Sequence, residues 1–193
     1  MTIDTTVQDT AERIAAYLTA EKPTLDPATA LDLEINDLLL KLDPTEEDLS
    51  TTMHRVVLQY WRGLPRVKDV PHQVKVDPEA LVPALGYLML VDVVGGHSGF
   101  RYSLYGTKIA RVAGFDMTGK TVWDIETRSA IQTFFAACYL AVIRLRRPLF
   151  TVHEAPPSIT TCHWHRLLLP LGPDGRITRI LVCNVPLHDG VPV

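Results

Sequence analysis

The chain has few cysteines and no long apolar run. Its three cysteines, Cys138, Cys162 and Cys183, are an odd number without the paired spacing of metal sites. This usage is typical of a reduced protein of the cytoplasm. No stretch approaches the roughly 20 apolar residues that a membrane span needs, and no secretory signal is visible at the N-terminus. We therefore expect a cytoplasmic protein without a membrane span.

Motifs of the common enzyme classes are also missing. No phosphate-binding Gly-x-x-x-x-Gly-Lys occurs, because Gly119-Lys120 lacks the upstream glycine. Asp116, Asp124 and Glu126 are close in sequence, but no partner for acid–base catalysis is evident, and roles as caps or surface charges explain them better. We expect no enzymatic activity and assign no catalytic residue.

The net charge of −3 is unevenly distributed along the chain. Residues 1–50 hold 12 acidic and 3 basic residues, whereas residues 51–193 hold 10 acidic and 16 basic residues. The acidic N-terminal part either lies against the basic remainder, faces a basic partner, or is a solvated surface, which is the favoured interpretation. The basic residues are too dispersed to indicate nucleic-acid binding.

Apolar residues recur at helical spacing in three N-terminal segments: residues 7–20, residues 27–42 after the start signal Asp26-Pro27, and residues 45–64 after Asp43-Pro44. We expect residues 1–64 to form an N-terminal extension of two or three amphipathic helices. These helices pack either on the sheet of their own chain or on a second copy. Trp61 is a possible anchor for a partner, although a buried tryptophan that ties its helix to the core is the favoured interpretation.

Residues 65–193 predict one domain that begins with a connector over residues 65–76. Strands are expected over residues 87–94, 100–105, 149–154, 161–171 and 177–185, with a long helix over residues 129–147. Two hairpins separated by a helical crossover give an α+β fold, with a five-stranded antiparallel sheet and helices on one face.

Residues 99–119 combine a short strand with glycine-punctuated helical turns, and several further motifs accompany them. They are Tyr60-Trp61-Arg62-Gly63, Pro65-Arg66, Asp77-Pro78, Phe100-Arg101-Tyr102-x-Leu104-x-Gly106-Thr107, Gly114-x-Asp116-x-Thr118-Gly119-Lys120 and Leu167-Leu168-Leu169-Pro170-Leu171. In this order and spacing, over roughly residues 50–187, the chain resembles the PAS sensory-domain family. It is most similar to a subgroup of small bacterial PAS proteins that often stand alone.

The resemblance implies a PAS-like sensory domain over residues 65–193 and, since helices before PAS cores frequently make dimer contacts, a homodimer. Photosensory flavin relatives carry a reactive cysteine in the short-helix region, but residues 106–128 contain none. Haem-binding relatives often place a histidine on the long helix, but residues 129–147 contain none. Covalent flavin and haem are therefore disfavoured, and the cofactor stays unknown.

A ligand pocket would lie between the sheet and the helices that cover it. The candidate lining residues are Tyr102, Trp123, Phe134, Phe135, Cys138, Tyr139 and His165. The competing interpretation is a filled core, because an aromatic stripe at helical spacing is more often core. The inward face of the His163–His165 strand is open, because Leu167 and Leu169 favour one parity while Trp164 and Leu168 favour the other.

Three histidines, His153, His163 and His165, fall on two neighbouring predicted strands. Imidazoles on one sheet face can hold zinc or copper, but the third position depends on the strand register. Solvated or packed histidines are the favoured interpretation, so no metal site is assigned.

The leading hypothesis is a sensory or regulatory protein that binds a small apolar or amphipathic metabolite, a signalling protein partner, or both. Its contact surfaces would be an exposed sheet face and the apolar stripes of residues 7–64. A constitutive interaction module with a filled core is the second hypothesis. A small metal-dependent enzyme that uses His153, His163 and His165 is the third.

Overall fold

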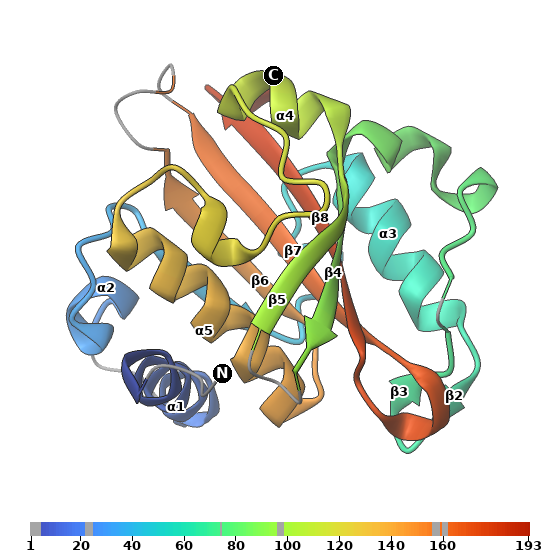
Figure 1. Ribbon diagram of the computed structural model, residues 1–193, viewed down its shortest axis with the longest axis horizontal. Helices are drawn as coiled ribbons and strands as arrows, with labels where there is room; N and C mark the ends of the chain where they lie inside the picture. The colour runs from blue at the N-terminus through green and yellow to red at the C-terminus, as the bar shows by residue number, and fades with distance from the viewer. Residues whose placement is uncertain (1–4, 22–24, 74, 96–98, 156–158, 160–161) are drawn as a thin grey trace.

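One antiparallel sheet runs through the molecule (Figure 1). The computed structural model describes residues 5–21, 25–73, 75–95, 99–155, 159 and 162–193. Within these ranges the sheet has seven strands in the order β1-β6-β7-β8-β4-β5, and β9 pairs with β8. The strands are β1 (Leu39–Leu42), β4 (Leu88–Val94), β5 (Gly99–Tyr105), β6 (Leu149–Glu154), β7 (His163–Leu171), β8 (Arg179–His188) and β9 (Val191–Pro192). A separate hairpin joins β2 (Arg66–Val67) to β3 (Val70–Pro71).

The α+β fold class is confirmed, and each of the five expected strands is present as β4 to β8. The strand count was too low, because β1 and β9 also join the sheet. β1 falls where a helix over residues 27–42 was expected, so that part of the prediction was wrong. Helix α2 (Pro27–Leu31) does begin at Asp26, whose side chain accepts a hydrogen bond from the Thr29 amide.

The early end of α2 has a local cause. Asp32 adopts the left-handed conformation, with φ 54°, and its amide donates to the carbonyls of Ala28 and Thr29. The short leucine run that follows fits a helix or a strand equally well by pattern. Its backbone pairs with the edge of β6, which brings Leu40 opposite Thr151. Hydrogen bonds to a distant strand therefore decide the structure of residues 39–42.

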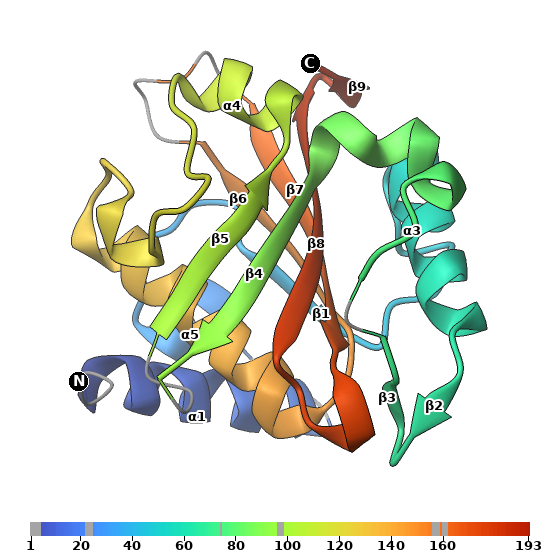
Figure 2. The ribbon, with the colours of Figure 1, turned by 45° about the vertical axis from the view of Figure 1, so that its right-hand side comes forward.

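Helices cover both faces of the sheet, so the prediction of helices on one face was wrong (Figure 2). α1 (Thr5–Thr19) packs on α5 (Ser129–Leu145) on one side of the sheet. α3 (Thr52–Gly63) and the 3-10 helix η1 (Glu79–Tyr87) pack on the other side. Central strands buried on both faces explain this arrangement, since Leu168 belongs to one core cluster and Leu167 to the other. The expected exposed sheet face is therefore covered.

α3 ties the second face to the sheet. It begins at Thr52 rather than after Asp43, because the Thr51 hydroxyl accepts a hydrogen bond from the His54 amide. Trp61 is buried, and its Nε1 donates to the Pro170 carbonyl oxygen at 2.8 Å. The favoured interpretation of Trp61 as a core residue is confirmed. Both β1 and α3, within the expected extension, thus pack into the body of the domain.

The acidic N-terminal part lies against the basic remainder at several points. Val7, Ala11 and Ile14 of α1 are buried, and the Glu12 carboxylate lies 3.4 Å from Arg144 on α5. Asp43 forms an ion pair with Arg147, just after α5. Exposed pairs of this kind contribute roughly 0–1 kcal/mol each, so the buried apolar stripe of α1 holds the helix in place.

The strand-to-helix turn at Gly106 depends on close backbone approach. A Cβ at this position would lie 2.3 Å from the Gly86 carbonyl oxygen, and such contacts do not occur in folded proteins. Helix α4 (Thr107–Ala113) follows directly and ends at Gly114, whose φ of 83° suits glycine. Gly106 is the N-cap of α4, and Thr107 is its first residue. The segment after α4 then crosses in front of the sheet towards α5 (Figure 1).

Candidate functional site

A cavity of about 630 Å³ lies between the sheet and α5. α5 contributes Ile131, Phe135 and Tyr139 to its wall, and the segments around residues 112–115 and 125–128 close it on another side. Its volume falls in the usual range of small-molecule sites, which is roughly 300–1,000 Å³.

The sheet forms the floor of the cavity with side chains from five of its strands: Met89, Tyr102, Tyr105, His153, Trp164, Arg166 and Asn184. The register explains how they come together, because His153 pairs with Trp164, and Arg166 lies between Thr151 and Asn184 on the neighbouring strands. Side chains alternate between the two faces of a strand, so Trp164 and Arg166 share the face towards α5. The residues of β7 that face the cavity are therefore those on the parity of Trp164 and Arg166.

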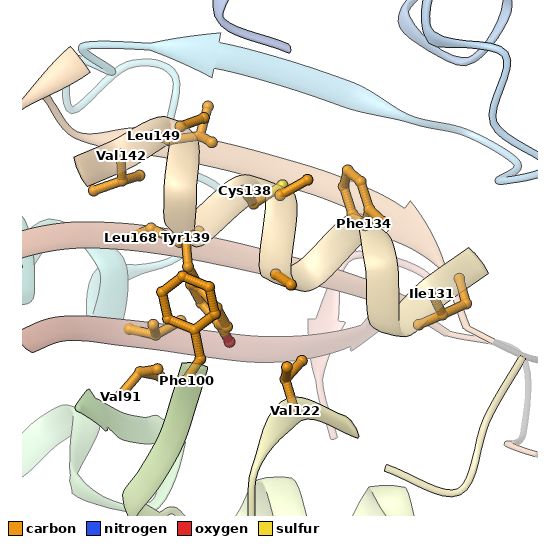
Figure 3. Packing of buried hydrophobic residues seen from close by; sticks show 14 of the residues in the cluster. Val91, Phe100, Val122, Ile131, Phe134, Cys138, Tyr139, Val142, Leu149 and Leu168 are labelled. Carbon is orange, nitrogen blue, oxygen red and sulfur yellow. The ribbon is translucent and has the colours of Figure 1, made fainter. Parts of the chain in front are cut away.

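Three of the seven residues expected to line a pocket do so: Tyr102, Phe135 and Tyr139. Phe134 and Cys138 are fully buried next to them but do not belong to the lining. Phe135 and Tyr139 are one helical turn apart and share a side of α5, and Phe134 and Cys138 occupy an adjacent side. Figure 3 shows Tyr139 pointing towards Phe100, with Phe134 and Cys138 on the other side of the helix.

Trp123 and His165 also lie outside the cavity lining. Trp123 belongs to the 3-10 helix η2 (Val122–Asp124) and is partly exposed at the surface. His165 points to the opposite face of the sheet, where its Nδ1 lies 2.6 Å from the Ser50 hydroxyl. Burial and the neighbouring His163 lower the pKa of His165 to about 4, so it is neutral at neutral pH.

The three histidines do not form a metal site. His153 faces α5, whereas His163 and His165 face the other way, and His163 Nε2 lies 2.9 Å from an Asp37 carboxylate oxygen. Within the described ranges, no group of three or more His, Cys, Asp or Glu residues has the arrangement of a metal site. The hypothesis of a metal-dependent enzyme built on these histidines was therefore wrong about their geometry.

Arg166 is a buried residue of the cavity lining that sequence reasoning missed. It is 1% exposed, and its Nη2 donates a hydrogen bond of 3.0 Å to the Tyr139 hydroxyl, which lies 3.1 Å from the Tyr102 hydroxyl. The guanidinium carbon lies 4.0 Å from the centroid of the Phe135 ring. The available signal was an arginine on the same parity as the apolar residues Trp164 and Leu168 of this strand.

Several polar atoms around Arg166 have no hydrogen-bond partner among the described residues. They are Arg166 Nε and Nη1, His153 Nδ1, Asn184 Oδ1 and Thr151 Oγ1. Buried polar groups are nearly always paired in folded proteins, so a cluster of unpaired ones is unusual. His153, Arg166 and Asn184 line the cavity, which therefore contains unused hydrogen-bonding capacity at one end.

The electrostatic character of this end is set by Arg166. Burial holds the pKa of His153 well below its ordinary value, with a further contribution from the Arg166 charge, so His153 is neutral. Burial also raises the pKa of Tyr102 and raises that of the Cys138 thiol to about 12. Glu126 and Arg128 line the cavity too, but they are exposed at its solvent side. The site thus offers binding groups, and Cys138 stays a protonated thiol.

A family model described as "PAS domain" matches residues 49–183, which is most of the chain. The chain belongs to the PAS domain family, and the predicted resemblance is confirmed at this level. Its antiparallel sheet and crossing helices have PAS-like topology.

No curated protein matches this sequence. The chain is similar to a solved structure titled "Structure of an RNA-binding Light-Oxygen-Voltage Receptor", with 10% identity and a TM-score of 0.45. The match covers 94% of this chain and 52% of that chain, so this chain spans about half of the receptor's length. Among the described residues, no helix has the length and hydropathy of a membrane span.

Proposed function

We propose that this protein is a PAS-type sensory or regulatory protein that binds a small molecule in the cavity between the sheet and α5, without a catalytic output of its own. PAS domains are typical of sensory and regulatory modules. The observation that carries the proposal is the cavity of about 630 Å³, which combines apolar walls with unpaired buried polar atoms. A small amphipathic metabolite would complement this cavity, because its apolar part would contact the walls and its polar part would pair with the unpaired atoms.

α5 offers a route from the cavity to the surface. Its Phe135 and Tyr139 line the cavity, and α1 packs on the same helix. A ligand that binds one arrangement of these helices better than another shifts the population towards that arrangement. We propose that a signalling protein or a second copy of the chain reads this change, and that the protein acts in the cytoplasm, where its free cysteines stay reduced.

A constitutive interaction module is the second candidate. The full burial of Phe134, Ala137 and Cys138 favours it, because this side of α5 packs as a filled core. The two functions differ in one respect that can be measured: only the sensor needs the cavity to be occupied.

Native mass spectrometry of protein purified without added ligand tests the proposal. We expect a reproducible extra mass that leaves on denaturation. Ala113 lines the cavity, so Ala113→Trp should fill part of it and abolish the extra mass. Ala16→Trp, on an exposed position of α1, is the matched control and should keep it. An empty wild-type protein that forms a clean dimer would instead support the interaction module.

A further inference from the structure

We propose that the ligand of this cavity is an organic acid, whose carboxylate is bound by Arg166 and whose apolar body lies against the aromatic wall. This inference rests on the proposed function, since it names the chemical class of the molecule that the cavity binds. It is carried by the burial of Arg166, by its unpaired donors and by the neutrality of its neighbours.

Arg166 places a positive charge in the interior of the protein. An arginine is protonated at all relevant pH values, and its burial without a counter-ion is strongly unfavourable. Among the described residues, the carboxylates that pair with arginines pair with Arg101, Arg144, Arg147 and Arg179, and Arg166 has none. A ligand carboxylate at this position would neutralise the guanidinium.

The guanidinium of Arg166 also has hydrogen-bond donors to spare. Arg166 uses Nη2 on Tyr139, while Nε and Nη1 have no partner among the described residues. The row of paired residues Thr151, Arg166 and Asn184 crosses three neighbouring strands and points to the cavity side. A carboxylate accepts several hydrogen bonds at once, and those donated by a guanidinium are among the strongest in proteins. The Thr151 hydroxyl, which is also unpaired among the described residues, can donate a further one.

The remaining wall of the cavity also fits an organic acid by its shape and charge. Met89, Ile131 and Trp164 are apolar or aromatic, and Arg166 is the buried cation of the lining. One cation balances the single charge of a carboxylate. A phosphate group carries more charge and would leave part of it unbalanced in a buried site.

Access of a ligand carboxylate to the Arg166 guanidinium depends on Phe135. Arg166 is covered by the half-buried Phe135 ring, which also lines the cavity. The carboxylate therefore reaches the guanidinium when the Phe135 side chain turns aside. This movement occurs on α5, the helix on which α1 packs, so binding is coupled to the proposed route of signalling.

Isothermal titration calorimetry of the full chain with matched acid and amide probes tests this proposal. The pairs are hydrocinnamate with hydrocinnamide and decanoate with decanamide, which share shape but differ in charge. We expect the acids to bind at least about tenfold more tightly than the amides. Arg166→Met should weaken acid binding roughly 10- to 100-fold and leave amide binding unchanged. Arg111→Met, an exposed arginine of α4 outside the lining, is the control and should change neither.

Arg166→Lys provides a second variant, which keeps the charge without the fork of donors and should retain a reduced preference for the acids. Equal binding of acid and amide to the wild-type protein, or unchanged acid binding to Arg166→Met, would overturn the proposal while leaving the cavity a small-molecule site. If no probe binds, the mass retained in native spectrometry decides: a retained carboxylic acid supports the proposal, and a retained neutral molecule overturns it. An empty cavity under both measurements would overturn the proposed function as well.

Discussion

Replacing Arg166 by methionine should stabilise the ligand-free protein. Burial of an unpaired guanidinium opposes folding by several kcal/mol. Two contacts offset part of this cost. The stacking of the guanidinium on Phe135 contributes about 2 kcal/mol, and the hydrogen bond to Tyr139 contributes roughly 1.5–3 kcal/mol. A buried methionine side chain contributes about 1.5–3 kcal/mol through its apolar surface. We expect a net gain of roughly 1–3 kcal/mol in the free energy of unfolding.

Urea unfolding at neutral pH measures this change, on protein shown by native mass spectrometry to be empty. The midpoint should rise while the dependence on urea stays constant, which indicates that stability and not compactness has changed. Arg111→Met should stay within about 0.5 kcal/mol of the wild type, as a surface substitution. A loss of about 2 kcal/mol or more in Arg166→Met would refute the reasoning. The contacts of Arg166 with Phe135 and Tyr139 would then outweigh its burial, and the arginine would be structural.

Three further predictions concern stability. Burial lowers the pKa of His54 to about 4, so the unfolded chain takes up a proton that the folded chain does not as pH falls from about 6.5 to 4. Stability should fall in this window, by about 2 kcal/mol at pH 5 from His54 alone. Urea midpoints measured across the window should depend less steeply on pH in His54→Gln than in the wild type. An unchanged dependence on pH would contradict the assignment to His54. Gly106→Ala should destabilise the protein by roughly 1–3 kcal/mol or more in thermal unfolding, because the added Cβ would meet the Gly86 carbonyl. The control Gly63→Ala has free space around the added Cβ and should be close to neutral in the same assay. Trp61→Phe removes the hydrogen bond to the Pro170 carbonyl and should cost roughly 1–3 kcal/mol in chemical denaturation; a neutral effect would show that α3 does not depend on this bond.

The helices and strands that the sequence predicted well are those with long, regular patterns. α5 and the strands β4 to β8 have either helical spacing or extended apolar runs bounded by glycine and proline. The failures are short segments whose structure depends on distant partners. Residues 39–42 become a strand because β6 offers a free edge, and α3 covers the sheet face that was expected to be open.

The candidate site was predicted in part for a similar reason. The helical spacing of Phe135 and Tyr139 follows from the sequence, but the choice between this side of α5 and the side of Phe134 depends on where the sheet lies. His165 was a candidate lining residue while the inward face of β7 stayed open, because the apolar residues of β7 are buried on both faces and give no parity. The burial of Arg166 emerges only from the register of three strands, which no local pattern specifies.

A crystal structure of the protein purified without added ligand tests the central claim most directly. We predict electron density for a non-protein molecule in the cavity beside Tyr139, with an anionic group against Arg166 and the Phe135 ring turned away from the guanidinium. A cavity closed by side chains, with Phe135 still stacked on Arg166 and the bound mass absent from the same preparation, would contradict the account.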